Sequence, residues 1–410
     1  SGIDRYEKSF NQIYTSGCDQ QIYIKIRWLY IKLQRRKSMK KRLLSMLLCV
    51  ALGCSLFVGC GSKNNDADAT KKENVSESKK EEESKEKPLI RVACTPYSGQ
   101  ILDAIASAKG FYDDEGIQVE LYFTHVPSDA QAALLAGHCD VLSTYGTPAP
   151  LKAISAGNDF TIFAGYMLEG DNPYIGRPGT EVKSIEDLVG KKIIGSLASD
   201  YIIANKLLDA GYDPNTDVTW VARGDAAANS EAVRKGEADY VSTTTGYETT
   251  AKEMGLIDAF YPDDFEPEYS CCRVYTSTEW LNNNQESVVS LLTAWMRAQE
   301  ILEKDPDYAV KQVVEQTELT EDYVKQFIYS DHFMIRLDPH WKAVSTAWEQ
   351  INRVGGFQGE TDIEYMKQHF NCELYKKALD RCVEKYYDED PEYYDFYQKY
   401  YQDVNADFLK

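Results

Sequence analysis

The sequence lacks the features that nucleic-acid-binding proteins and structural zinc sites require. Asp and Glu number 65 against 45 Lys and Arg, a net charge of −20, whereas a phosphate-binding surface needs an excess of basic side chains. The chain has five histidines, no Cys-x-x-Cys pair and no His-rich segment beside its cysteines. We therefore expect no nucleic-acid partner, no metal and no cofactor.

The sequence also lacks a long apolar run near its start that could cross a membrane. The apolar run at 43–58 has 16 residues, whereas a membrane span needs about 20. A basic stretch, Met39–Arg42, precedes this run, which is typical of a secretory signal. We interpret residues 39–59 as a signal peptide and residues 1–38 as translated upstream or non-native sequence. An uncleaved membrane anchor is the alternative.

The end of the apolar run, Leu56–Ser62, resembles the lipobox of bacterial lipoproteins, in which a cysteine receives a diacylglyceryl group. On this resemblance Cys60 is the lipidated residue, although Phe57 replaces the usual Leu and Leu52–Cys54 is a weaker competing site. The segment that follows is polar and has no aromatic residue, so it cannot bury enough apolar surface to fold. We expect residues 60–88 to be a disordered tether that holds the protein on the outer face of the cell membrane.

The six cysteines beyond Cys60 suggest no disulfide framework. Cys94 and the pair Cys271–Cys272 lie in apolar, strand-like runs, where a buried cysteine packs as a small hydrophobic residue. Cys372 and Cys382 would lie about 15 Å apart on one helix, too far for a disulfide unless the chain turns back between them. We expect free thiols.

From residue 89 onward, short apolar runs alternate with amphipathic segments. Ser128 and Ser199 are the expected N-caps of two of the helices, and Ser184 with Asp187 resembles a capping box. Repeated strand–helix alternation indicates parallel βαβ units, so we expect two α/β lobes joined by two crossings and followed by a helical region. The expected strands are at 89–94, 117–121, 141–144, 160–166, 192–194, 217–222, 239–243 and 271–276, and the long C-terminal helices at 279–303, 320–330 and 340–354.

Four segments of this region resemble the taurine/nitrate/sulfonate/thiamine-precursor class of ABC transporter substrate-binding lipoproteins. They are AKGFYDDEG at 108–116, AALLAG at 132–137 with Asp140, SIEDLVGKK at 184–192 and EAVRKGEAD at 231–239. The likeness covers roughly residues 89–335. It implies an α/β, two-lobed type II periplasmic binding protein fold with a helical C-terminal region. We expect the first part of lobe 1 at 89–168, lobe 2 at 169–269, the return to lobe 1 at 270–340 and a C-terminal extension at 341–410.

In this fold a ligand would lie between the lobes, because open α/β sheets bind ligands at the carboxyl ends of their strands, beside helix N-termini. Tyrosines, hydroxyls and free amides occur in the corresponding loops, although Ser128 and Ser199 could serve only as helix caps. The candidate ligand contacts are Tyr97, Ser98, Ser128, Tyr145, Gly146, Thr147, Ser199, Asp200, Tyr201, Thr245 and Tyr247.

The candidate loops contain aromatic and acidic residues and no Lys or Arg. Aromatic walls with Asp200 or Glu248 favour a heterocyclic or cationic nutrient, such as a pyrimidine precursor of thiamine. A sulfonate- or nitrate-type anion is the alternative ligand, and Arg223 is the one cation nearby, which we expect at the solvent surface. A tyrosine-rich stretch at 386–410 is either an amphipathic helix packed on the protein or a partner-binding face.

The resemblance implies an extracytoplasmic solute-binding lipoprotein of an ABC importer, whose partners are a small-molecule ligand and a membrane permease. We expect a monomer and not an enzyme. Some relatives with this fold make the thiamine pyrimidine, but they need a Lys and a His in the cleft, and among the histidines His125 alone lies near a predicted cleft loop. A sensory receptor that reports the ligand to a membrane kinase is the other alternative.

Overall fold

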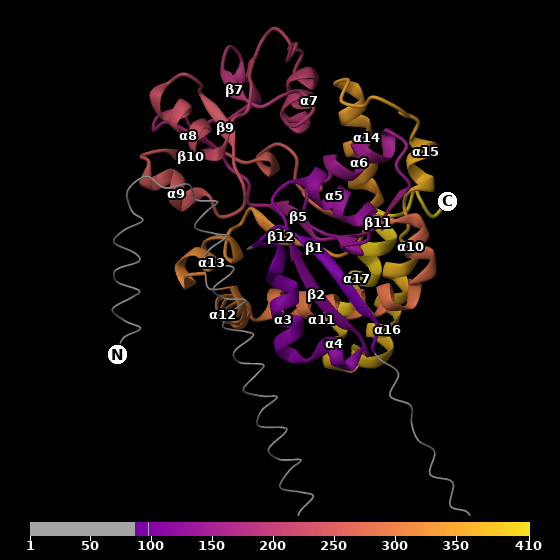
Figure 1. Ribbon diagram of the computed structural model, residues 1–410. Coiled ribbons are helices and arrows are strands. Elements are labelled where there is room, and N and C mark those ends of the chain that lie inside the picture. The colour runs from indigo at the N-terminus through magenta and orange to yellow at the C-terminus, as the bar shows by residue number, and fades with distance from the viewer. Residues whose placement is uncertain (1–86, 97, 318) are drawn as a thin grey trace, which may run out of the picture. The chain divides into compact units, whose positions relative to one another are not determined.

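A computed structural model describes residues 87–96, 98–317 and 319–410 (Figure 1). The predicted signal peptide, the lipidation site Cys60, the tether up to residue 86 and the candidate Tyr97 lie outside the described residues. Among the helices of the described part, none is both long and apolar enough to cross a membrane.

The first sheet has five strands in the order β2-β1-β3-β11-β4. β1 pairs in parallel with β2 and β3, whereas β11 runs antiparallel to β3 and β4. The strands are β1 (Leu89–Cys94), β2 (Gln118–Phe123), β3 (Val141–Leu142), β4 (Phe160–Gly165) and β11 (Arg273–Ser277). The connecting helices are η1 (Ser98–Gln100), α3 (Ile101–Lys109), α4 (Phe111–Asp114), α5 (Pro127–Leu135) and α6 (Pro148–Ser155). The predicted strand–helix alternation is confirmed for this lobe.

The second sheet repeats the same plan in the order β10-β6-β9-β7-β8. β7 is the central parallel partner of β8 and β9, and β6 is antiparallel to β9 and β10. The strands are β6 (Tyr174–Gly176), β7 (Lys192–Ile194), β8 (Thr219–Val221), β9 (Tyr240–Ser242) and β10 (Ile257–Phe260). The helices are η2 (Ile185–Leu188), α7 (Tyr201–Asp209), α8 (Ala226–Lys235) and α9 (Glu248–Glu253). We call the first sheet with its helices lobe 1 and the second sheet with its helices lobe 2.

The helix starts follow local chemistry, and two of the predicted caps are wrong. Ser184 and Asp187 form the expected capping box at η2. However, α5 begins at Pro127, whose fixed φ suits the first helical position, so Val126 takes the N-cap position and Ser128 caps nothing. At α7 the N-cap is Asp200, and the Ser199 hydroxyl bonds instead to Ser196 and Asp200.

Two crossovers connect the lobes. The first contains β5 (Met167–Gly170), which pairs antiparallel with β12 (Phe333–Ile335), and the second runs from Tyr261 to Cys272 and contains η3 (Pro262–Asp264). Three residues in these crossovers, Asp171, Glu268 and Ser270, have positive φ although they are not glycine. Such backbone costs on the order of 1–3 kcal/mol each and persists where the surrounding contacts fix it.

The C-terminal helices pack on lobe 1 and extend its core. α11 lies against α3 and α16, and α14 contacts α6 of lobe 1 and α7 of lobe 2. α17 buries Tyr394, Tyr397 and Tyr401, so the tyrosine-rich stretch is an amphipathic helix packed on the protein. These helices are α10 (Thr278–Asn283), α11 (Gln285–Lys304), α12 (Pro306–Thr317), α13 (Glu321–Ile328), α14 (Trp341–Arg353), α15 (Ile363–Gln368), α16 (Glu373–Tyr386), η4 (Tyr387–Glu389) and α17 (Pro391–Val404).

Candidate functional site

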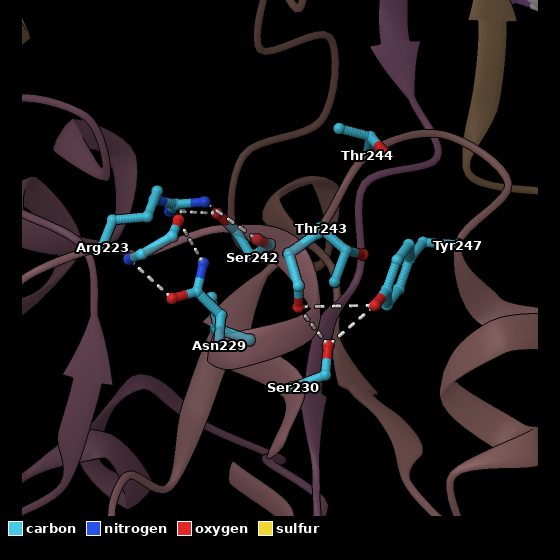
Figure 2. A pocket seen from close by; sticks show the side chains of 10 residues that line it. Arg223, Asn229, Ser230, Ser242, Thr243, Thr244 and Tyr247 are labelled. Atoms are coloured by element: carbon cyan, nitrogen blue, oxygen red, sulfur yellow. Dashed lines mark hydrogen bonds between the residues drawn. The ribbon is translucent and has the colours of Figure 1, made fainter. Parts of the chain in front are cut away.

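A pocket of about 170 Å³ lies in lobe 2 at the carboxyl ends of β8 and β9, beside the first turn of α8 (Figure 2). This is the sheet edge at which open α/β folds hold ligands. Its wall contains several hydroxyl groups. The lining residues with side-chain donors or acceptors are Arg223, Asn229, Ser230, Ser242, Thr243, Thr244 and Tyr247.

Arg223 supplies the positive charge of this pocket. Its guanidinium donates to the backbone oxygen of Ser242 at 3.1 Å and to the Ser242 hydroxyl at 2.8 Å, as Figure 2 shows. Asp200 Oδ1 lies 3.7 Å from the same guanidinium, and 40% of the Arg223 side chain remains exposed. Because a guanidinium has five N–H donors, these contacts leave donors for a bound molecule.

The first turn of α8 is shaped by side chains that hold its backbone. Asn229 bonds both the N–H and the C=O of Gly224, which fixes the turn between β8 and α8. Asp225 is the N-cap and accepts from the amide of Ala228 at 2.7 Å. The Ser230 hydroxyl bonds the Tyr247 hydroxyl at 2.9 Å, so the Tyr247 ring forms a fixed wall of the pocket.

The carboxyl edges of the two sheets meet near this pocket. Lys152 on α6 of lobe 1 donates to the backbone oxygen of Ala198, in the loop between β7 and α7 of lobe 2, at 3.1 Å. Burial lowers the pKa of Lys152, although the charge of Asp200 opposes this shift.

Comparison with known proteins places these features in a family. The family model described as "NMT1/THI5 like" matches residues 101–309, half of the chain, which contain the second sheet, both crossovers and every strand of the first sheet except β1. The chain belongs to the NMT1/THI5-like family.

Named proteins are similar in sequence or in structure to this NMT1/THI5-like chain. A curated protein of Bacillus subtilis (strain 168), named "Putative binding protein YtlA", is 21% identical over 267 residues, 60% of this chain and 78% of the relative. The nitrate-binding protein NrtA from Synechocystis PCC 6803 has a similar structure, with a TM-score of 0.59, 14% identity and coverage of 72% of this chain and 88% of that one.

A second solved structure is the ligand-binding component of an ABC-type import system from Staphylococcus aureus with zinc bound. It matches with a TM-score of 0.57 and 14% identity, and covers 71% of this chain and 99% of that one. These likenesses confirm the predicted two-lobed periplasmic binding protein fold. Among the described residues of this NMT1/THI5-like protein, no group of three or more His, Cys, Asp and Glu is placed to hold a metal ion.

Two of the predicted acidic contacts are already engaged within the NMT1/THI5-like fold. Asp200 is 4% exposed and accepts from the Tyr174 hydroxyl at 2.6 Å, from the Ser196 amide at 3.0 Å and from the Ser199 hydroxyl. Glu248 is 3% exposed and accepts from Gln326. Burial and the neighbouring carboxyl of Asp171 raise the pKa of Glu248 to about 9, so Glu248 carries a proton at pH 7.

In lobe 1 the predicted contacts make bonds within the protein. The Thr147 amide donates to the Cys271 oxygen at 2.8 Å, and its hydroxyl bonds Ser270 at 2.9 Å. Tyr145 is 6% exposed and belongs to the hydrophobic core, and Ser98 is buried. Gly146 is half-buried, with φ of +76°.

The other predicted contacts are spread over the molecule. Ser128 is exposed on α5, and Tyr201 packs against the core of lobe 1. Thr245 donates to the Gly170 oxygen at 2.6 Å in the first crossover, and Ser199 lies in the loop before α7. Tyr247 is the predicted residue that also lines the pocket of lobe 2.

The pocket contains residues that the sequence reasoning missed. The loops chosen from the sequence omitted the one between β8 and α8, which contributes Gly224, Ala226 and Arg223. Arg223 was named as the one nearby cation but was not counted among the ligand contacts. Asn229 and Ser230 follow on the first turns of α8. The available signal was an Asp at position 225 before a run of alanines, which is typical of a helix N-cap at a strand's carboxyl end.

Proposed function

We propose that this chain is the extracytoplasmic solute-binding protein of an ABC-type importer and that it closes its two lobes on a small molecule. The observation that carries the proposal is a hydroxyl-rich pocket at the carboxyl edge of the lobe 2 sheet, an edge that Lys152 of lobe 1 contacts through the loop between β7 and α7. Membership of the NMT1/THI5-like family and the fold of an ABC-type import component support it. Ligand contacts from both lobes would stabilise the closed form, which the membrane permease would recognise.

The ligand of this proposal carries an anionic or acceptor-rich group, such as a carboxylate, a sulfonate or nitrate. Arg223 offers donors, whereas Asp200 is engaged by three donors and Glu248 is neutral. The first-turn amides of Ala226 and Ala227 have no acceptor among the described residues, and such amides favour anions. These contacts favour the anion alternative over the cationic heterocycle expected from the sequence.

The pocket supports binding rather than catalysis. Its lining contains no histidine, cysteine or carboxylate among the described residues, so it has no side chain suited to general acid–base or nucleophilic chemistry near neutral pH. Lipidation at Cys60, export by residues 39–59 and a monomeric state belong to the same proposal and remain predictions.

The test is a calorimetric titration of the full chain with nitrate, taurine, an alkanesulfonate, a pyrimidine and a primary amine. For the anion that binds, Arg223→Gln should weaken affinity by about 10–100-fold, since a hydrogen bond to a charged group contributes about 1.5–3 kcal/mol. Arg234→Gln is the matched control, because Arg234 lies in the last turn of α8, away from the pocket, and pairs with Glu231 in solvent.

The control variant should bind as the unmodified chain does. Binding of the amine or pyrimidine alone would keep a solute-binding function but overturn the anionic ligand class. An anion affinity that is equal in the Arg223→Gln variant and the unmodified chain would remove Arg223 from the site.

A further inference from the structure

Two adjacent cysteines lie where the second crossover joins β11. Their sulfur atoms are 3.4 Å apart, Cys271 is half-buried and Cys272 is 3% exposed. Cys271 Sγ also lies 3.4 Å from the side-chain amide of Asn172 in the first crossover. The other cysteines in the described part of the chain are free, buried thiols that are not adjacent in sequence to another cysteine: Cys94, Cys139, Cys372 and Cys382.

The backbone of this dipeptide connects three parts of the fold. The amides of Cys271 and Cys272 donate to the oxygens of Leu168 and Met167 in β5, at 2.9 and 2.8 Å. The Cys271 oxygen accepts from the Thr147 amide, in the turn before α6, at 2.8 Å. The dipeptide therefore links both crossovers to the carboxyl edge of the first sheet.

We propose that Cys271 and Cys272 form a redox-active dithiol that is converted reversibly to a vicinal disulfide by a low-molecular-weight disulfide. The Cys271 thiolate attacks one sulfur of the small disulfide, forms a mixed disulfide and releases one thiolate, which takes a proton. The Cys272 thiolate then attacks Cys271 Sγ, closes the S–S bond and releases the second small thiolate. One small disulfide is reduced to two thiols, and two protein thiols are oxidised to one disulfide.

The surroundings set the order of these two steps. Cys271 is the more exposed residue of the pair, since it is half-buried whereas Cys272 is 3% exposed. The contact with the Cys272 thiol lowers the pKa of Cys271, and the same contact together with burial raises the pKa of Cys272. The thiolate is the attacking species in disulfide exchange, so Cys271 is the entering group and Cys272 the resolving one.

The resulting disulfide would be easily reduced. Adjacent Cα atoms are about 3.8 Å apart across a trans peptide, below the 4.4–6.8 Å of ordinary disulfides. Strained disulfides of this kind are the labile ones. Because closing the ring re-orients the peptide between the two cysteines, oxidation should disturb the amide bonds to Leu168 and Met167 and so change the crossovers on which lobe movement depends.

The experiment treats the full chain with excess oxidised glutathione, blocks the remaining thiols and digests the protein with trypsin. Residues 253–273 form one tryptic peptide that contains both cysteines and no third one. We expect this peptide to lose two hydrogen atoms, to regain them in dithiothreitol, and to leave the peptides of Cys372 and Cys382 unchanged. Hydrogen exchange should rise in 166–170 and 271–272 on oxidation and stay unchanged in α16.

Single-residue variants separate the two roles. Cys272→Ser should accumulate glutathione on Cys271, because the resolving thiol is absent, whereas Cys271→Ser should react with glutathione at least 10-fold more slowly. The proposal is overturned if the unmodified peptide keeps two free thiols or stops at the mixed disulfide. These readings are peptide masses and exchange rates, so they do not depend on which solute the protein binds.

Discussion

The two lobes have the same strand order but differ in the size of their hydrophobic cores and in the contacts at the carboxyl edges of their sheets. In lobe 1 a continuous hydrophobic core joins the sheet to α3, α11, α14, α16 and α17, and the residues at its carboxyl edge bond to the crossovers. In lobe 2 two smaller hydrophobic clusters pack on the sheet, and the carboxyl edge retains a pocket with a partly exposed arginine. The topology places the carboxyl edge of each sheet where a ligand could bind. Whether the side chains at that edge can contact a ligand depends on the bonds that they already make within the protein.

Under the proposed function, lobe 1 would be the fixed half and lobe 2 the half that moves and selects the ligand. α14 bridges them: the Asn205 side chain on α7 donates to the Gln350 oxygen at 3.0 Å, and the Gln350 side chain donates to Glu266 at 2.7 Å. Equivalent substitutions should therefore lower the stability of lobe 1 more than that of lobe 2, whereas charge changes in lobe 2 should alter ligand binding.

The largest effect should come from a tryptophan in the core of lobe 1. Trp295 is fully buried, and its indole N–H donates to the Tyr112 hydroxyl at 2.9 Å. Trp295→Ala should lower the free energy of unfolding by about 3–5 kcal/mol, because it leaves a cavity and removes this bond. Trp220 in lobe 2 is half-buried and bonds Pro214, so Trp220→Ala should cost about 1–2 kcal/mol. Equal losses in urea titrations would contradict the contrast between the lobes.

A substitution at Glu248, the first residue of α9, should change the free energy of unfolding by a smaller amount, and this change should depend on pH. With a pKa raised to about 9, the folded chain keeps a proton that the unfolded chain releases near pH 4.3. The free energy of unfolding should therefore fall as pH rises through this window, since the folded state binds more protons. Glu248→Gln keeps the shape and the acceptor for Gln326, so it should add on the order of 2 kcal/mol at pH 8 and little at pH 5.

Unfolding curves at several pH values check this prediction. Glu253→Gln is the matched control, because Glu253 is an exposed carboxylate at the other end of the same helix. A gain of equal size at pH 5 and pH 8 would mean that packing, and not the retained proton, limits stability at this position.

Much of the fold followed from local sequence pattern. The apolar run at Leu89–Cys94 predicted β1 with its observed bounds, and the spacing of Ser184 and Asp187 predicted their capping box. The strands missed from the sequence were β5, β6, β10 and β12, each of three or four residues. β6 lies between β9 and β10 and pairs with both, and β5 pairs with β12. Such short strands leave little periodicity to detect, so their formation depends on partners distant in sequence.

The site was harder to predict for the same reason. The sequence shows that Asp200 precedes a helix, but not that Tyr174 and the Ser196 amide will occupy its oxygens. It shows that Arg223 follows a strand, but not that Ser242, from the neighbouring strand, holds the guanidinium at the pocket. Each of these contacts joins segments whose proximity depends on the pairing of the sheet.

The smallest expected changes in the free energy of unfolding are at two helix N-termini, one in each lobe. Asp225 caps α8 with a bond to the Ala228 amide, so Asp225→Ala should cost about 1 kcal/mol of unfolding free energy. Ser128 is exposed and caps nothing, so Ser128→Ala should change stability by less than about 0.5 kcal/mol. If an anion binds beside Arg223, removing the Asp225 carboxylate should also tighten its binding by about 2–5-fold, because the negative charge at the helix start opposes it. A variant that is less stable but binds the anion more tightly would show that in lobe 2 the cap and the ligand compete for the same helix end; unchanged affinity would place the anion away from α8.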